Sequence, residues 1–471
     1  MMLLLVILGI LFCIGSLMTF SLVSDVQNKP YMDEVFHVPQ AQQYCSANFT
    51  HWDPMITTLP GLYLMSVGVL KPVAAIFNIP VMELCTTYWL RTTNILFTFG
   101  NFYLIYAVLR KLHNPVFDPD GIKIAMTTLA LSLLPVLYFF TFLYYTDPGS
   151  TFFVLIMYLF CLHGNHFMAA ILGTAAIFFR QTNIIWVIFM AGLAVRKELS
   201  LWLKQICDKK DMKLDDLNDL DLLKVTFTVI LDCAKKKRNL LFSLLLNILK
   251  NVWAYLLVGV GFGVFIILNK GIVVGDRTQH VAVMHFPQLF YFLTMTNFFA
   301  MFHLCSPYKV WEFLKFCIRH PLFLLSFTAV AFLMIHYFTY EHKYLLADNR
   351  HYAFYVWRKL YRRHKYVKYI LIPAYLYFFW SVLDELKGRD IYWKTVYSVC
   401  VITSAVPQKL LEYRYFILPF LIFRMNMRHG TAVGLFHEIL LYTVVNVLTV
   451  YMFVEKPYKW PHEDGIQRFM W

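Results

Sequence analysis

The chain has 471 residues, of which 59% are hydrophobic, 18% aromatic and only 15% charged. Soluble globular domains are about half apolar and about a quarter charged, so these proportions exclude an ordinary soluble protein and indicate lipid as the main solvent. The formal net charge is +14, but the Lys and Arg residues gather in short patches between apolar runs, as at 234–239 and 358–368. Such patches are typical of the cytoplasmic side of a multispan membrane protein and argue against a nucleic-acid partner.

The first apolar run, 3–23, is long enough to cross a hydrocarbon core of roughly 30 Å as a helix. It lacks a preceding basic region and a clear cleavage site, which favours a retained signal-anchor helix. The next segment, 25–85, is rich in Pro, His, Tyr and Trp and contains no uninterrupted spanning run. It is predicted to be a folded loop on the membrane surface. Whether Cys45 and Cys85 of this loop pair in an oxidising lumen stays open.

The rest of the chain alternates apolar segments with short polar connections. Several segments are short, so we expect between about ten and thirteen membrane helices. The charged insert at 196–245 is rich in Lys and Arg and is predicted to be cytoplasmic. The predicted spans are 86–109, 124–145, 150–163, 167–179, 183–196, 246–268, 287–305, 321–338, 367–383, 391–406, 412–424 and 431–454.

Counting spans outward from the insert divides the connections between two faces. The luminal ones are predicted to be 25–85, 143–150, 180–183, 269–286 and 339–352. A sequon at Asn48-Phe49-Thr50, the only one in the chain, agrees with this and predicts a glycan on Asn48. Residues 1–471 are therefore treated as one all-α polytopic membrane domain, with 25–85 as its luminal catalytic loop.

Two adjacent carboxylates, Asp33 and Glu34, directly follow the first span. Acids at such a position are commonly solvated helix caps. Here, however, Tyr31, His37 and Gln40 surround them with groups that suit sugar hydroxyls and ring faces. A carboxylate that is partly desolvated beside a membrane can be tuned to act as a general base. The sequence does not decide between the two acids.

Further polar clusters lie in the other predicted luminal connections. Trp52 and Asp53 begin a turn where the indole is either a membrane-belt residue or a sugar platform. Cations on the luminal side run against the positive-inside rule, and contact with a lipid-linked phosphate is one reason for them. The candidates for that contact are Lys343, Arg350, His351, Arg277 and His280.

Three further kinds of polar residue lie outside these clusters: Arg180, the acids of 219–221 and the scattered histidines. Arg180 lies between two apolar helices, where an ionisable residue is a functional candidate by default. The acids of the run 219–221 resemble a metal-binding spacing but lie in the cytoplasmic insert, where a solvated face is the better interpretation. The histidines show no metal-ligand spacing, so neither a metal site nor a cofactor is predicted.

Several stretches together resemble a known family. They are "YMDEVFHVPQAQQY", "WDPMITTLPGLYL", "FRQTNIIW", "HKYLLADNRHYAFYVWR", "PQKLLEYRYFILP" and "IQRFMW". They are similar to the alpha-1,2-glucosyltransferases of the endoplasmic reticulum, which add the last glucose to the dolichol-linked oligosaccharide for N-glycosylation. The resemblance runs from residue 30 to the end. It implies a GT-C fold in the endoplasmic reticulum membrane, with the active site at the luminal face.

The resemblance also implies substrates and roles. The donor would be dolichyl phosphate glucose, and the acceptor the diglucosylated, nine-mannose oligosaccharide on dolichyl diphosphate. The β-linked donor becomes an α-1,2 product, so the anomeric carbon inverts, which needs one base. Asp33 is the first choice for that base, with Glu34 second or orienting the acceptor. Lys343, Arg350 and His351, with Arg277 behind them, would bind the donor phosphate. The expected substrate contacts are Tyr31, His37, Gln40, Trp52, Asp53, Asp348 and Asn349.

Two other functions remain as alternatives. A transporter or flippase for a lipid-linked solute would need ionisable residues along a path through the helices and, commonly, an internal repeat. The polar residues gather at one face and no repeat is visible, which favours the enzyme. A mannosyltransferase of the same fold is opposed only by the family-specific stretches. Residues 351–365 form either a short re-entrant or interfacial helix, or the predicted topology slips by one span there.

Overall fold

The computed structural model describes residues 2–113, 121–207, 217–278, 281–428, 430–461 and 463–471. His280 and part of the charged insert, 208–216, lie outside the described residues. Most of the described chain is helical. One antiparallel hairpin is present in this part of the chain, formed by β1 (Tyr458–Trp460) and β2 (Glu463–Gln467).

The helices follow the apolar runs of the sequence. In chain order they are α1 (Met2–Val26), α2 (Glu34–Cys45), α3 (Gly61–Phe77), α4 (Val81–Leu84), α5 (Thr87–Leu112), α6 (Ile122–Ser132), α7 (Pro135–Phe140), α8 (Asp147–Leu162), α9 (His166–Phe179), α10 (Ile184–Cys207), α11 (Asp219–Lys236), α12 (Arg238–Asn269), α13 (Gln288–Phe299), α14 (Met301–Leu304), α15 (Pro307–Arg319), α16 (Pro321–Phe338), α17 (Lys343–Ala347), α18 (Tyr352–Val356), α19 (Val367–Ile370), α20 (Ile372–Glu385), α21 (Ile391–Ala405), α22 (Ile417–Asn426) and α23 (Ala432–Glu455).

Six helical segments in the described residues are long and apolar enough to cross a membrane. In lipid every backbone N–H and C=O must find a partner within the protein, which a helix provides. The outward faces stay apolar and exposed, and only 11% of the 321–338 segment is buried. The chain is thus an all-α integral membrane protein. The six segments are Leu3–Val26, Thr87–Leu112, Arg238–Asn269, Pro321–Phe338, Val367–Gly388 and Ala432–Glu455.

Some predicted spans are broken in the structure. The single helix expected at 124–145 is wrong, because the segment divides into α6 and α7. Pro135 begins α7, and a proline inside a continuous helix would remove a hydrogen bond and clash with the preceding turn. The helix expected at 287–305 likewise divides into α13 and α14. The carbonyl at the end of α13, that of Phe299, accepts the Tyr442 hydroxyl instead at 3.0 Å.

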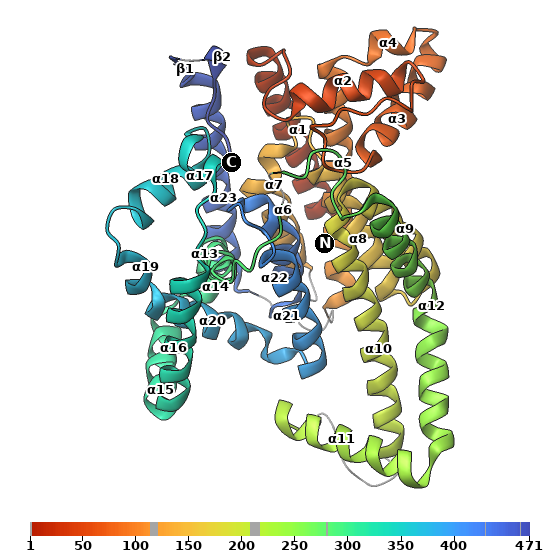
Figure 1. The fold of residues 1–471 in the computed structure, drawn as a ribbon, viewed down its shortest axis with the longest axis vertical. Helices are drawn as coiled ribbons and strands as arrows, with labels where there is room; N and C mark the ends of the chain where they lie inside the picture. Colours follow the sequence, from red (N-terminus) through yellow and green to blue (C-terminus); the bar gives the residue numbers. More distant parts are fainter. Residues whose placement is uncertain (1, 114–120, 208–216, 279–280, 429, 462) are drawn as a thin grey trace.

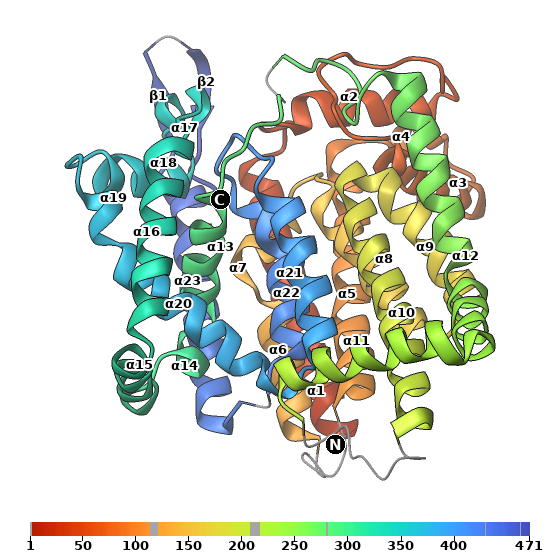
Figure 2. The same ribbon diagram turned by 60° about the horizontal axis from the view of Figure 1, so that its bottom comes forward.

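The connections gather at two opposite ends of the bundle. Figure 1 shows α2, α3, α4 and the β1–β2 hairpin at one end, and α11 and α15 at the other. Figure 2, turned by 60°, keeps the same separation. The connection after α12 reaches the first loop, since the Asp276 N–H donates to the Pro54 carbonyl at 2.7 Å. The first loop and the hairpin thus lie at one end of the bundle and α11 of the charged insert at the other, while the sides of the membrane that they face stay a prediction.

The first loop has a small core of its own. α2 packs against α3, and their inner faces share an apolar cluster that includes Val38, Tyr44, Tyr63 and Leu70. A disulfide joins Cys45, at the end of α2, to Cys85. The pairing that the sequence left open is therefore present.

A glycine sets where α3 starts. A Cβ on Gly61 would come within 2.6 Å of the backbone carbon of Phe178, near the end of α9. Only glycine allows this close approach of two backbones. It places the first loop directly against the connection that carries Arg180.

Residues 351–365 contain a short helix. α18 runs from Tyr352 to Val356 and continues as a π-helical turn, Trp357–Tyr361, before the chain reaches α19. A short helix is therefore present in this stretch, and its re-entrant or interfacial placement stays a prediction.

Replacing Cys85 with Ser should destabilise the first loop. The disulfide closes a loop with a sequence separation of 40, and constraining an unfolded loop of that length contributes about 4 kcal/mol in the chain-entropy description. Thermal unfolding of the purified protein in detergent should therefore shift down by several degrees. Cys305→Ser, at an exposed free thiol, is the control and should leave the midpoint unchanged. Full alkylation of Cys45 and Cys85 in denatured, unreduced protein would contradict the pairing.

Candidate active site

A residue in the left-handed backbone conformation, Met32, precedes the two adjacent acids. Met32 has φ 55°, and α2 begins two residues later at Glu34, with Asp33 at its N-cap. The turn directs the neighbouring carboxylates into different environments. The Glu34 side chain is 0% exposed, whereas that of Asp33 is 45% exposed.

Glu34 is held by four hydrogen bonds. Arg91 of α5 donates from Nε to Oε1 at 2.8 Å and from Nη2 to Oε2 at 2.6 Å. The backbone N–H groups of Tyr144 and Tyr31 donate to the same two oxygens at 2.6 and 3.0 Å. A carboxylate has about four acceptor positions, so little capacity remains for a substrate proton. Glu34 is a tie between the first loop and α5.

Asp33 faces a cluster of charges from distant parts of the chain. Its carboxylate lies 3.5 Å from Nη2 of Arg414, which precedes α22. Arg414 also pairs with Glu412 and lies 3.6 Å from Asp147 at the start of α8. Asp147 in turn pairs with Arg180 at 2.6 Å. We call Asp33, Asp147, Arg180, Glu412 and Arg414 the charge cluster.

Burial and ion pairing act against each other at Glu412 and Arg414 of the charge cluster. Burial raises the pKa of the Glu412 carboxyl, but the Arg414 and Arg180 guanidiniums lower it, and the net pKa is below its usual value. Burial lowers the pKa of Arg414, but Glu412, Asp147 and Asp33 raise it well above its usual value. Asp33, the most exposed of the three carboxyl groups, is the one open to a ligand.

Aromatic side chains and His37 fix this geometry. The Tyr145 hydroxyl accepts the Asp33 N–H at 3.2 Å, and the Arg414 guanidinium lies 5.1 Å from the centroid of the Tyr145 ring. His37, one helical turn after Asp33 on α2, is linked through Nδ1 to the Tyr63 hydroxyl at 2.5 Å. Burial lowers the pKa of His37. The imidazole is thus held neutral beside the exposed acid.

The other predicted contacts in the first loop are Gln40, Asp53 and Trp52. Gln40 is 1% exposed, and its amide binds the His51 carbonyl at 2.8 Å and the Asp53 N–H at 2.9 Å, so it holds the turn together. The Asp53 carboxylate accepts from the Met55 N–H. Trp52 packs edge-on to Tyr63, with ring centroids 6.1 Å apart. Among the described residues its indole N–H has no acceptor, although it is buried.

The predicted cluster around 348–351 is linked to the same site through the last residues of the chain. His351 Nδ1 is bonded to the Trp471 carbonyl, and the Trp471 ring packs on Tyr413, which lies beside Glu412. Arg350 is paired with Asp348 at 2.8 Å and lies 4.5 Å from the centroid of Trp460 in the hairpin. The structure therefore brings together two of the clusters found in the sequence.

The remaining predicted residues have other surroundings. The Asn349 amide oxygen accepts from the Tyr458 hydroxyl and the Trp460 indole N–H, at 3.0 and 2.8 Å. The Arg277 guanidinium donates to backbone carbonyls in and just after the last turn of α12, including that of Lys270 at 2.9 Å. Lys343 is exposed at the start of α17. Tyr31 is buried, with its hydroxyl bonded to the backbone of Arg468.

Three members of the charge cluster were not selected from the sequence. Asp147 lies in the predicted luminal turn 143–150, and Glu412 and Arg414 lie inside the stretch "PQKLLEYRYFILP". The rule that selected Arg180, an ionisable residue between apolar helices, applies equally to them. This rule could have selected all three residues, but it does not show which charged side chains contact one another in the fold.

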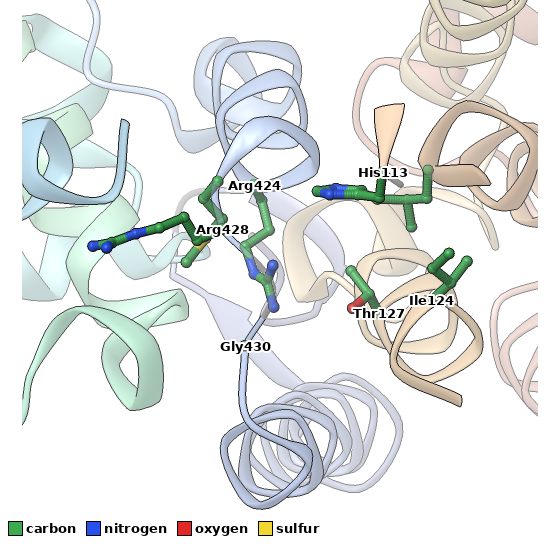
Figure 3. Close-up of a pocket in the computed structure, with 8 residues that line it drawn as sticks. His113, Ile124, Thr127, Arg424, Arg428 and Gly430 are labelled. Atoms are coloured by element: carbon green, nitrogen blue, oxygen red, sulfur yellow. The ribbon is translucent and has the colours of Figure 1, made fainter. Parts of the chain in front are cut away.

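A second buried charge cluster lies at the opposite end of the bundle. Arg424 of α22 pairs with Glu438 of α23 at 2.7 Å, and Nε2 of His303 lies 3.0 Å from both, either donating to Glu438 or accepting from Arg424. Arg424 also borders a small cavity (Figure 3). The Tyr442 hydroxyl lies 3.2 Å from Glu438 as well, so these groups are mutually satisfied and join helices rather than await a ligand.

Among the described residues, no set of three His, Cys, Asp or Glu side chains is placed to hold a metal ion.

Fold and site together define a polytopic helical membrane protein with one exposed carboxylate inside a buried network of charges. The DIE2/ALG10 family model matches residues 27–425, and the chain belongs to this family. A protein of Rattus norvegicus named "Dol-P-Glc:Glc(2)Man(9)GlcNAc(2)-PP-Dol alpha-1,2-glucosyltransferase" is 46% identical over 460 residues, covering 97% of this chain and 96% of the relative.

Relatives with the same name occur in distant organisms. One from Homo sapiens is 45% identical over 461 residues, covering 97% of this chain and 96% of the relative. One from Arabidopsis thaliana is 36% identical over 505 residues, with 96% of each chain covered. No solved structure matches the chain.

Glu34→Gln should destabilise the fold. It would leave the buried Arg91 guanidinium without a counter-ion, and breaking a buried pair on one side costs about 3–5 kcal/mol. Thermal unfolding in detergent should show a large fall for Glu34→Gln and little change for Asp33→Asn. The double variant Glu34→Gln/Arg91→Gln should lose less than the sum of the two single changes. Equal midpoints for Glu34→Gln and wild type would contradict the structural role.

Proposed function

We propose that this protein is an inverting glucosyltransferase that moves glucose from dolichyl phosphate glucose to the diglucosylated nine-mannose oligosaccharide on dolichyl diphosphate. The observation that carries this is the family membership, together with relatives of the same name that match nearly the full length of the chain. The reaction forms an alpha-1,2 linkage and requires no cofactor. The competing function, a transporter for a lipid-linked solute, is not favoured by these names.

Asp33 is the base in this proposal. The acceptor hydroxyl attacks the anomeric carbon of the donor, its proton passes to the Asp33 carboxylate, and the bond from that carbon to the phosphate oxygen breaks. Dolichyl phosphate leaves, and the configuration at the carbon inverts. The exposure of Asp33 and the full hydrogen-bonding of Glu34 support this choice.

Stabilisation of the leaving phosphate is assigned to cations of the predicted luminal loops and of the charge cluster. The sequence candidates Lys343, His351, Arg350 and Arg277 stay in this role; the Lys343 side chain is exposed, and Arg350 pairs with Asp348. Arg414 of the charge cluster lies 3.5 Å from Asp33, and Arg180 pairs with the neighbouring Asp147. Preorganised charges of this kind stabilise a developing anion without reorganisation.

The site is proposed to face the lumen of the endoplasmic reticulum, within a GT-C fold. The exposed sequon at Asn48, the disulfide in the same loop and the basic insert at the opposite end support this orientation.

Asp33→Asn should abolish transfer without unfolding the protein. Loss of a general base costs about 10²- to 10⁴-fold in rate. The measurement is transfer of labelled glucose from dolichyl phosphate glucose to the diglucosylated acceptor by purified protein. Glu83→Gln, an exposed carboxylate in the same loop, is the matched control and should keep wild-type activity. Wild-type rates with Asp33→Asn would remove Asp33 as the base, and no product with wild type would remove the proposed reaction.

Asn48 should carry a glycan if the loop is luminal. Its side chain is exposed, and its amide nitrogen donates only to Gln43, at 2.9 Å, among the described residues. Digestion with an endoglycosidase should increase gel mobility by one glycan, and Asn48→Gln should give the same mobility undigested. A cytoplasmic first loop would instead show no shift in either experiment.

A further inference from the structure

The segment 467–471 contacts residues next to the candidate site on three loops, at Tyr31, Arg350 and Tyr413. Tyr31, two residues before Asp33, donates its hydroxyl to the Arg468 carbonyl at 2.7 Å and accepts the Arg468 N–H at 2.8 Å. On the other side, the Met470 N–H donates to the Arg350 carbonyl at 2.8 Å. These bonds join the loop that carries the acidic pair to the loop that carries Arg350 and His351.

Arg468 anchors the segment to the helical bundle. Its guanidinium donates to the carbonyls of Phe453 and Val454, at 2.7 and 3.2 Å, in the last turn of α23. It also donates to the Val26 carbonyl, the last residue of α1, at 3.2 Å. The unpaired carbonyls at a helix C-terminus carry partial negative charge, and a cation there is stabilising. One side chain, 5% exposed, thus caps two helices at once.

Trp471 reaches the charge cluster from the other direction. Its ring packs against Tyr413 edge-on, with centroids 5.9 Å apart, and Tyr413 lies between Glu412 and Arg414 in the chain. The same ring lies 4.4 Å from the centroid of Tyr352 and 6.0 Å from that of Phe299. Its indole N–H is buried and has no acceptor in the described part of the chain, so packing rather than hydrogen bonding holds the ring.

We infer that residues 467–471 form a strap that sets the distance between the Asp33 loop and the Arg414 loop, with Arg468 and Trp471 as positioning residues. This rests on the proposed transfer reaction. The two loops are more than 370 residues apart in sequence, and their charges meet directly at the 3.5 Å pair of Asp33 and Arg414. A second, uncharged link through the strap keeps that pair in place when substrate enters and competes for either charge.

The strap should therefore control turnover more than stability. Trp471→Ala should lower kcat by about 10²-fold, the loss expected when catalytic groups move by about 1 Å, and change the acceptor KM much less. Trp471→Phe retains an aromatic ring and should keep most of the activity. Ile466→Ala, at an exposed position beside the strap, is the control.

Amide hydrogen exchange gives a readout that does not depend on activity. In Arg468→Ala, peptides covering 27–38 and 410–416 should exchange faster, while peptides from α5 and α12 should not change. Unchanged kcat for Trp471→Ala together with unchanged exchange in both loops for Arg468→Ala would overturn the strap. A lower unfolding midpoint for Trp471→Ala, together with a wild-type kcat at temperatures well below that midpoint, would also overturn the proposal. Failure of the wild type to make product rejects the reaction, and the exchange measurement then tests the strap alone.

Discussion

The buried ion pair between Glu34 and Arg91 is the constraint on which the site depends. Glu34 is adjacent to Asp33, so fixing one carboxylate by four hydrogen bonds fixes the backbone from which the other projects. The cost of burying Glu34 is met by an opposite charge and by two backbone N–H groups. Asp33 is consequently rigid in position while its own carboxylate stays half exposed. A base that must meet a hydroxyl of a large substrate needs both properties.

The charge cluster shows how several acids are accommodated close together in a membrane protein. Its members come from four separate connections, and each carboxylate lies near a guanidinium. Removing one member changes the balance for all the others, so effects of single substitutions there will not add. The cluster at the opposite end, around Arg424 and Glu438, has the same chemistry but no exposed carboxylate. Exposure, rather than charge alone, distinguishes the candidate site from a structural tie.

Much of the fold could be predicted because lipid enforces long apolar helices. The first loop, the charged insert at the opposite end of the bundle and the six long apolar helices were identified from hydropathy and charge. The divided helices at Pro135 and after Phe299 were not, because a break within an apolar run depends on tertiary contacts such as that of the Tyr442 hydroxyl. The site was found in part: Asp33, His37 and Arg180 were selected from their surroundings. Arg414 and Glu412 were missed because sequence spacing cannot reveal which charges meet across several hundred residues.

The disulfide in the first loop also bears on the order in which the protein is made. Both of its cysteines lie within the first 85 residues, and Arg91 follows six residues later. The disulfide and the Glu34–Arg91 pair can thus form while most spanning helices are still unsynthesised. The Tyr144 N–H that also holds Glu34, and the Arg414 guanidinium that pairs with Asp33, are added later and must assemble around this first part. Formation of the disulfide then requires oxidising conditions at the earliest stage of synthesis.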